Sequence, residues 1–307
     1  MRRIICLVIT VFTVTGALSS SGSAIGNLGR TIEIDDQFEF SNISSPVLAP
    51  DGNSVFFVVE QMDYEAGHSR FQIMRQMLPD GVPTHFTARD YDSWRPTLSI
   101  DGRSLFFLSD RVGGEAQLWE KKLNEDAQPV QVTAIDGGID DINFSSDQAK
   151  LLLVRKDQHV RPLLVQGSRP WVIDRLSFKR DYEGYVLDQR EHIYVYEIRT
   201  QKMRQLTFGD YDDSEPAWSP DDQRVAFVSN RNIDGTYDTD VWVAQVDMSR
   251  ELEKITVNRG ADSSPLWHPD GKIIYTRSAK PDSYDNYAVR HLSEVDVRSG
   301  EQTWLTE

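Results

Sequence analysis

The sequence predicts an all-β fold, a β-propeller with at least five four-stranded blades that forms part of a larger ring. Three observations lead to this prediction. An aspartate turn recurs five times, an apolar residue followed by threonine recurs five times, and no stretch shows a sustained helical pattern of 3.6 residues. Both landmarks repeat about every 50 residues, which is the length of a propeller blade that buries both faces of its sheet against its neighbours.

The first landmark is a hairpin turn followed by a short apolar run. The five turns read Pro50-Asp51-Gly52, Ile100-Asp101-Gly102, Ser146-Asp147-Gln148, Pro220-Asp221-Asp222 and Pro269-Asp270-Gly271. The runs that follow are 55–59, 105–108, 151–154, 225–228 and 273–275. Glycine supplies the positive φ that tight hairpins need, so Asp-Gly between two extended segments predicts a hairpin.

The second landmark is the threonine that ends each unit. The threonines are Thr87, Thr133, Thr207, Thr256 and Thr306. Each of the first four lies fourteen residues before the next turn aspartate. Counting fourteen residues back from each threonine reaches Ile73, Trp119, Ile193, Trp242 and Leu292, the expected centres of the third strands. Each unit therefore holds four strands, and the expected blades are 44–87, 94–133, 140–207, 214–256 and 262–306.

The first 24 residues have the features of an export signal. Arg2 and Arg3 precede an apolar run of about fourteen residues that ends at Ala17, too short to span a bilayer. The only cysteine lies inside this signal, at position 6, so the mature chain has no thiol to oxidise. We expect a signal peptide at 1–24, an N-terminal segment at 25–43 and the propeller at 44–307. The expected location is periplasmic or secreted, with no membrane insertion after signal cleavage.

Charge excludes some partners. The formal net charge is −15, and loss of the two signal arginines makes it −17 because residues 1–24 contain no acid. An acidic surface repels phosphate backbones and anionic lipids, so no nucleic-acid partner is expected.

Trp218 and Trp267 precede two of the turns, where they are expected to fill the space between blades. A strand at Thr31–Phe40 is a candidate for pairing with an outer blade.

The third unit carries an insertion. From the turn aspartate to the third-strand residue the five units measure 22, 18, 46, 21 and 22 residues, which leaves roughly 25 extra residues between Leu151 and Ile193. Additional loops of a propeller gather on one face and carry contacts. The alternative is an extended hairpin without a partner.

No catalytic, cofactor-binding or metal-binding residue can be assigned. The sequence has no Gly-x-Ser-x-Gly nucleophile elbow and no His-Glu-x-x-His zinc motif. The six histidines, at 68, 85, 159, 192, 268 and 291, occupy unrelated positions of different units. His268 stands where another unit has Ser219, so a role in the turn is expected.

Two polar clusters have ordinary structural interpretations. The first imitates a calcium loop with Asn230, Asn232, Asp234, Gly235 and Asp238. Its twelfth position is Val241 instead of the glutamate that an EF-hand requires, so it is interpreted as a hairpin loop. The second cluster is Asp210, Asp212, Asp213 and Glu215, which is interpreted as a solvated loop.

The fourth unit resembles a known repeat. Three segments, from the end of the third unit into the fourth, together resemble the propeller repeat of TolB-like and prolyl-oligopeptidase-type proteins. They are Leu206-Thr207, then Asp210-Tyr211-Asp212-Asp213-Ser214-Glu215-Pro216-Ala217-Trp218-Ser219-Pro220-Asp221, and then 225–231. Three further segments resemble S9 family serine peptidases of the acylaminoacyl-peptidase or dipeptidyl-peptidase type. They are 169–175 (Arg-Pro-Trp-Val-Ile-Asp-Arg) and 188–195 in the third unit, and 45–52 at the start of the first unit. The resemblance covers residues 40–306.

In the S9 family a propeller caps a C-terminal α/β-hydrolase domain that holds the catalytic triad, and it limits access to small peptides. The resemblance therefore implies a non-catalytic gating propeller whose partners are the hydrolase domain and small peptides, without a cofactor. No catalytic residue transfers to this chain, and whether it acts as an enzyme stays open. The family usually has more than five blades, so a fragment is expected. The alternatives are a free-standing periplasmic TolB-like propeller that binds a protein or peptide, and a complete five-bladed enzyme of another type.

Overall fold

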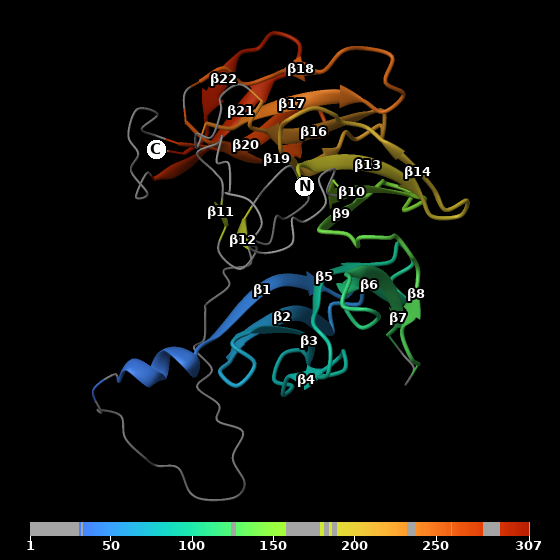
Figure 1. Ribbon diagram of the computed structural model, residues 1–307, viewed down its shortest axis with the longest axis vertical. Helices are drawn as coiled ribbons and strands as arrows, with labels where there is room; N and C mark the ends of the chain where they lie inside the picture. Colours follow the sequence, from blue (N-terminus) through green and yellow to red (C-terminus); the bar gives the residue numbers. More distant parts are fainter. Residues whose placement is uncertain are drawn as a thin grey trace, which may run out of the picture.

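The computed structural model describes residues 31, 33–123, 127–157, 179–180, 184–185, 189–231, 238–258, 260–278 and 289–306. Five four-stranded antiparallel sheets form the blades of a β-propeller, which confirms the predicted fold class (Figure 1). Blade 1 contains β1 (Ser41–Leu48), β2 (Ser54–Asp63), β3 (His68–Met77) and β4 (Thr84–His85). Blade 2 contains β5 (Ser93–Leu98), β6 (Ser104–Ser109), β7 (Gln117–Lys122) and β8 (Val130–Gln131).

The other three blades follow in the same strand order. Blade 3 contains β9 (Asp141–Phe144), β10 (Lys150–Lys156), β13 (Glu191–Glu197) and β14 (Lys202–Gln205). Blade 4 contains β15 (Asp213–Trp218), β16 (Arg224–Ser229), β17 (Asp240–Gln245) and β18 (Glu253–Lys254). Blade 5 contains β19 (Asp262–Trp267), β20 (Lys272–Ser278), β21 (Arg290–Asp296) and β22 (Gln302–Trp304). The first strand of each blade lies toward the centre of the arrangement, and blades 1 and 5 are its two ends (Figure 1).

The aspartate turns are equivalent in all five blades. The carboxylate of the turn aspartate accepts the backbone N–H two residues further on at 2.9–3.1 Å in every case. The residue after the aspartate has a positive φ throughout, between 52° and 91°. Three blades place glycine there, but Gln148 and Asp222 adopt the same conformation, so the aspartate hydrogen bond is the more constant feature of the turn.

The threonine landmark has a structural role that explains its recurrence. Each threonine Oγ1 accepts the backbone N–H of a third-strand residue at 2.9–3.2 Å. The donors are Ile73, Leu118, Ile193, Val241 and Leu292. All five residues predicted as strand centres lie within their third strands, but in blades 2 and 4 the donor to the threonine is the residue before the predicted centre, Leu118 and Val241. The stretch between the donor and the threonine is one residue longer in these blades, and a shift of one residue changes the face of the strand.

The core lies between consecutive blades in four apolar clusters. Trp218 and Trp267 are only 9% and 7% exposed and pack at the junctions of blades 3–4 and 4–5. Their indole N–H groups donate to the carbonyls of Asn143 and Ala217 on the first strand of the preceding blade, at 3.1 and 3.2 Å. The two tryptophans thus fill the space between blades, as predicted.

The segment before blade 1 is not a strand. Residues Ile34–Phe38 form a short 3-10 helix, η1, so the expectation of a strand at Thr31–Phe40 was wrong. The carboxylate of Asp36 accepts the N–H of Glu33 at 2.8 Å, and such local hydrogen bonds compete with strand pairing. Within the described ranges, no helix has the length and apolar character needed to cross a membrane.

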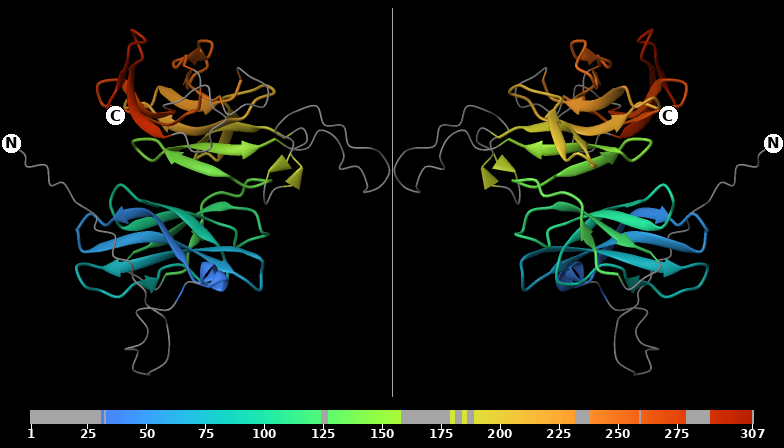
Figure 2. Two further views of the ribbon diagram at one scale, coloured as in Figure 1. Left: turned by 90° about the vertical axis from the view of Figure 1, so that its left-hand side faces the viewer. Right: turned by 90° about the vertical axis from the view of Figure 1, so that its right-hand side faces the viewer.

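The blade topology gives the molecule two different faces, seen from the side in Figure 2. Turns between the first and second strands lie on one face, called the turn face here. Loops between the second and third strands and the linkers between blades lie on the opposite face, called the linker face. The insertion of blade 3 follows a second strand and therefore lies on the linker face, where its described part is the hairpin of β11 (Lys179–Arg180) and β12 (Gly184–Tyr185).

Candidate functional site

Four of the five innermost strands carry a β-bulge at the same place. The register shifts in β1, β5, β15 and β19, immediately before a proline. The residues at these bulges are Ser45, Arg95, Glu215 and Ser264, all with φ between 50° and 55° and all exposed. Proline cannot donate to the ladder, so pairing is interrupted there. The signal was present in the sequence, because each proline stands five residues before its turn aspartate, but the sequence analysis missed it.

The bulge residues connect neighbouring blades through polar contacts. Arg95 Nη2 lies 2.6 Å from Asp141 Oδ2, which joins the first strands of blades 2 and 3. Glu215 Oε2 accepts the backbone N–H of Ser264 at 2.5 Å, which joins blades 4 and 5. Burial raises the pKa of Asp141, and the Arg95 charge acts against this rise. We call Ser45, Arg95, Asp141, Glu215 and Ser264 the axial rim.

A cavity of about 430 Å³ opens beside the axial rim between blades 1 and 2. Phe71 and Trp94 line it, with their ring centroids 6.4 Å apart, together with Arg95 and Asp110. Burial raises the pKa of Asp110, and the nearby charge of Asp92 adds to the effect. The cavity therefore combines aromatic surface with charged groups next to the centre of the propeller.

The two ends of the insertion are held together at the linker face. The N–H of Asp157 donates to the carbonyl of Arg190 at 2.7 Å, and the side chain of Gln189 donates to the carbonyl of Asp157 at 3.0 Å. Arg190 is only 4% exposed and lies 3.0 Å from Asp210 of the following linker. The insertion thus leaves and re-enters blade 3 at one fixed point.

A buried ionic network lies beneath this point. His192, 2% exposed, places Nε2 3.3 Å from Asp157 Oδ2 and Nδ1 3.4 Å from Asp213 Oδ2. Arg231 Nη2 contacts both oxygens of Asp213 at 2.6 and 2.8 Å. Asp213 is fully buried, so a carboxylate there depends on the guanidinium of Arg231 and on its hydrogen-bond partners. The network joins blade 4 to the base of the insertion.

The solvated-loop interpretation of the acidic cluster was therefore wrong for Asp213. Asp212 is also engaged, since it accepts the N–H of Glu191 at 3.2 Å and its own N–H donates to Asn230 at 2.9 Å. These acids form a joint between blades 3 and 4. Sequence reasoning could not find it, because the partner Arg231 lies in the turn that follows another strand, β16.

The remaining candidates can be placed briefly. His268 Nδ1 lies 2.7 Å from Asp270 Oδ1, as its expected role in the turn requires. Residues 232–237 of the calcium-like loop and residues 169–175 of the insertion lie outside the described residues. In the described part of the chain, no group of three or more His, Cys, Asp or Glu side chains could hold a metal ion.

Comparisons with known proteins agree with this architecture. No family model matches the chain. The chain is 24% identical over 316 residues to dipeptidyl-peptidase 5 of Porphyromonas gingivalis, covering 95% of this chain and 45% of that protein. Acylaminoacyl peptidase of Pyrococcus horikoshii superposes with a TM-score of 0.60 at 17% identity, over 88% of this chain and 40% of the other. A putative TolB from Agrobacterium tumefaciens gives 0.54 at 18% identity, over 86% and 80%.

The chain is thus a five-blade β-propeller whose structural neighbours include acylaminoacyl peptidase and a putative TolB, and its relatives in sequence include peptidases and TolB proteins. It spans 31% and 45% of the length of two such relatives.

Proposed function

We propose that this chain is the non-catalytic gating propeller of an exported S9-type serine peptidase that acts on small peptides. The observation that carries the proposal is the axial rim, where the charged side chains of Arg95 and Glu215 each contact the innermost strand of the next blade. Arg95 and Asp141, 2.6 Å apart, lie on or at the ends of innermost strands beside the centre of the propeller (Figure 1), where a peptide on its way to a hydrolase domain would pass. The sequence similarity to dipeptidyl-peptidase 5 over 95% of the chain supports the same function.

The test has two steps. Sequencing the gene beyond the codon for Glu307 should reveal an in-frame Gly-x-Ser-x-Gly region, the nucleophile elbow of an α/β-hydrolase. In the resulting peptidase, the double substitution Arg95→Ala with Asp141→Ala should raise the hydrolysis of long peptides relative to dipeptidyl substrates. Lys202→Ala, at an exposed outer strand, is the control. An unchanged ratio of long to short substrates would refute the gating role.

A second candidate function is a free-standing periplasmic propeller that binds a protein or peptide. It is favoured by the TolB comparison, because the chain covers 80% of that structure. A stop codon after Glu307 with unrelated sequence beyond it would favour this function. The purified chain should then be a compact monomer with one sharp unfolding transition.

A further inference from the structure

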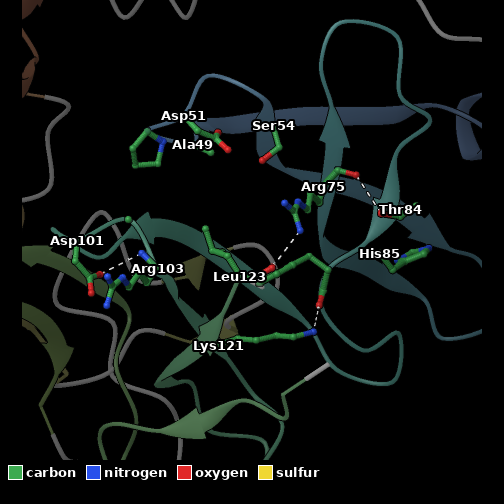
Figure 3. Close-up of a pocket in the computed structure, with 13 residues that line it drawn as sticks. Ala49, Asp51, Ser54, Arg75, Thr84, His85, Asp101, Arg103, Lys121 and Leu123 are labelled. Atoms are coloured by element: carbon green, nitrogen blue, oxygen red, sulfur yellow. Dashed lines mark hydrogen bonds between the residues drawn. The ribbon is translucent and has the colours of Figure 1, made fainter. Parts of the chain in front are cut away.

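A second pocket lies on the turn face, on the side opposite to the insertion. It occupies about 750 Å³ between blades 1 and 2 (Figure 3). The aspartate turns of the two blades, at Asp51 and Asp101, form part of its wall, and Arg75, His85, Arg103 and Lys121 also line it. Cations thus gather in a protein in which 48 acidic residues outnumber 33 basic ones.

Two of these cations have no acidic partner within the described residues. Arg75 donates from Nη1 to the carbonyl of Leu123 at 3.1 Å and lies over the ring of Phe56, while its Nε is buried without a hydrogen-bond partner. Arg103 hydrogen-bonds to Asp101 through its backbone N–H, and no carboxylate lies within ion-pair distance of its guanidinium in the described part of the chain. By contrast, Arg95 has an aspartate at 2.6 Å. Among the described residues, the positive charge of Arg75 and Arg103 is therefore not neutralised by direct pairing.

The equivalent junction of blades 3 and 4 shows what the fold itself requires at these positions. The hydrogen-bond register aligns Arg75 with Val195, Arg103 with Gln223 and Lys121 with Ala244. Val195 and Ala244 are 6% and 1% exposed and belong to the apolar cluster of that junction. Buried apolar residues stand in blades 3 and 4 where blades 1 and 2 have arginine and lysine.

The junction of blades 4 and 5 also has buried apolar residues at the positions of Arg75 and Lys121. Val243 and Val295, 3% and 0% exposed, take the places of Arg75 and Lys121. Lys272 takes the place of Arg103, and it is paired with Glu294 at 2.6 Å. At these equivalent positions neither junction has a cation without an acidic partner among its described residues, so Arg75 and Arg103 are not a requirement of the propeller.

We propose that this pocket binds a carboxylate-bearing peptide, through either its C-terminal carboxylate or an acidic side chain. A guanidinium matches a carboxylate with two parallel hydrogen bonds, and Arg75 and Arg103 present two guanidinium groups to one cavity. The volume lies within the range of about 300–1,000 Å³ typical of ligand sites. The carboxylate of Asp101 is engaged by Ser99 and by its own turn. This site lies on the turn face and is independent of the gating function proposed above.

The test is isothermal titration calorimetry of the whole chain with three acetylated tetrapeptides. One is Gly-Ser-Gly-Leu with a free carboxylate, the second is its C-terminal amide, and the third is Gly-Glu-Gly-Leu amide. The peptide with the free C-terminal carboxylate, the peptide with glutamate, or both should bind, and which of them binds identifies the source of the carboxylate. The Gly-Ser-Gly-Leu amide, which has no carboxylate, should not bind. Arg103→Gln and Lys121→Met should each weaken binding by about tenfold or more, the usual result of losing a charged hydrogen-bond partner.

The matched control is Arg204→Gln. Arg204 donates to the carbonyl of Val246 at the junction of blades 3 and 4. Val246 occupies the position that Leu123 has in blade 2, so this substitution removes an arginine charge from a comparable contact outside the pocket. It should leave peptide binding unchanged, and thermal melting should show that all variants are folded. Three results would each overturn the proposal: no binding of either carboxylate peptide at millimolar concentration, equal weakening by Arg204→Gln, or tighter binding of inorganic phosphate than of both carboxylate peptides.

Discussion

Blades 3 and 5 carry the same local structure in different surroundings. In blade 3 the N–H of Ile193 donates to Thr207 Oγ1 at 3.0 Å, and in blade 5 the N–H of Leu292 donates to Thr306 Oγ1 at 2.9 Å. Ile193 is fully buried, whereas Leu292 is 43% exposed. Thr207 is likewise fully buried, and Thr306 is exposed.

The difference comes from the next blade. Ile193 and Leu206 pack against Trp218 and Phe227 of blade 4. The outer side of blade 5 receives no such cover from the described residues, so Leu305 is 47% exposed where its counterpart Leu206 is 3% exposed. A short motif therefore builds the strand pair, but only a neighbouring sheet turns its apolar residue into a core residue.

The largest expected difference is in the cost of removing the third-strand residue. Ile193→Ala should lower the free energy of unfolding by about 2–5 kcal/mol, because it leaves a cavity between two blades. Leu292→Ala should cost less than about 1 kcal/mol, because solvent already reaches that side chain. Urea denaturation of both variants measures the difference. Equal losses would mean that the outer side of blade 5 is covered in solution.

The covered side of blade 5 gives a second test through pH. Asp262 at the start of β19 is fully buried, Asn258 donates to its Oδ1 at 2.8 Å, and its Oδ2 has no hydrogen-bond partner. Burial, with the charge of Asp240 adding to it, raises the pKa of Asp262 from 3.8 to about 6. The folded state therefore holds a proton more tightly than the unfolded chain does. This tighter proton binding adds about 3 kcal/mol to the free energy of unfolding. The added stability is fully present below pH 4 and is lost as the pH rises to about 6.

Asp262→Asn should remove this dependence. The variant should be more stable than the original chain at pH 8 by up to about 3 kcal/mol and should gain little at pH 4. Melting temperatures at the two pH values provide the measurement, with Asp80→Asn, at an exposed turn, as the control for a changed charge. A stabilisation that is the same at both pH values would contradict the assigned pKa.

The threonine hydrogen bond should show the same contrast on a smaller scale. Thr207→Val leaves the buried N–H of Ile193 without its side-chain acceptor and should cost about 1–2 kcal/mol. Thr306→Val should cost less than about 0.5 kcal/mol, because water can replace the hydroxyl at an exposed site. Chemical denaturation of the pair is the measurement. A larger loss for Thr306→Val would reverse the comparison.

The smallest effect on stability, but a visible one on association, is expected at the exposed apolar residues of blade 5. Contiguous apolar surface promotes self-association, so the chain should bind a hydrophobic dye and elute as more than a monomer. Leu292→Lys with Leu305→Lys should reduce both signals. Val130→Lys is the control, because it changes a residue of blade 2 that is 66% exposed. Light scattering after size exclusion that shows a monomer for the original chain would contradict the prediction.

The repeat could be predicted from sequence because its hydrogen bonds close within one blade. The aspartate turn joins residues two positions apart, and Thr87 accepts the N–H of Ile73 within a single hairpin. Trp218 and Trp267 could be assigned to the space between blades because they stand at a fixed distance before the turn aspartate. The count of fourteen also placed Trp119 correctly within the third strand of blade 2, whereas the register of the folded strands showed that the neighbouring Leu118 donates to Thr133.

The candidate sites lay beyond sequence because each depends on packing between blades. Arg95 and Asp141 are 46 residues apart in the chain and meet only where two innermost strands approach each other. Asp213 was assigned to solvent from its acidic neighbours, but the folded chain buries it between His192 and Arg231. The sequence by itself determined the blade, whose contacts are local. The tertiary structure decided which charges are buried, paired or left facing a pocket, because those outcomes depend on how separate sheets pack.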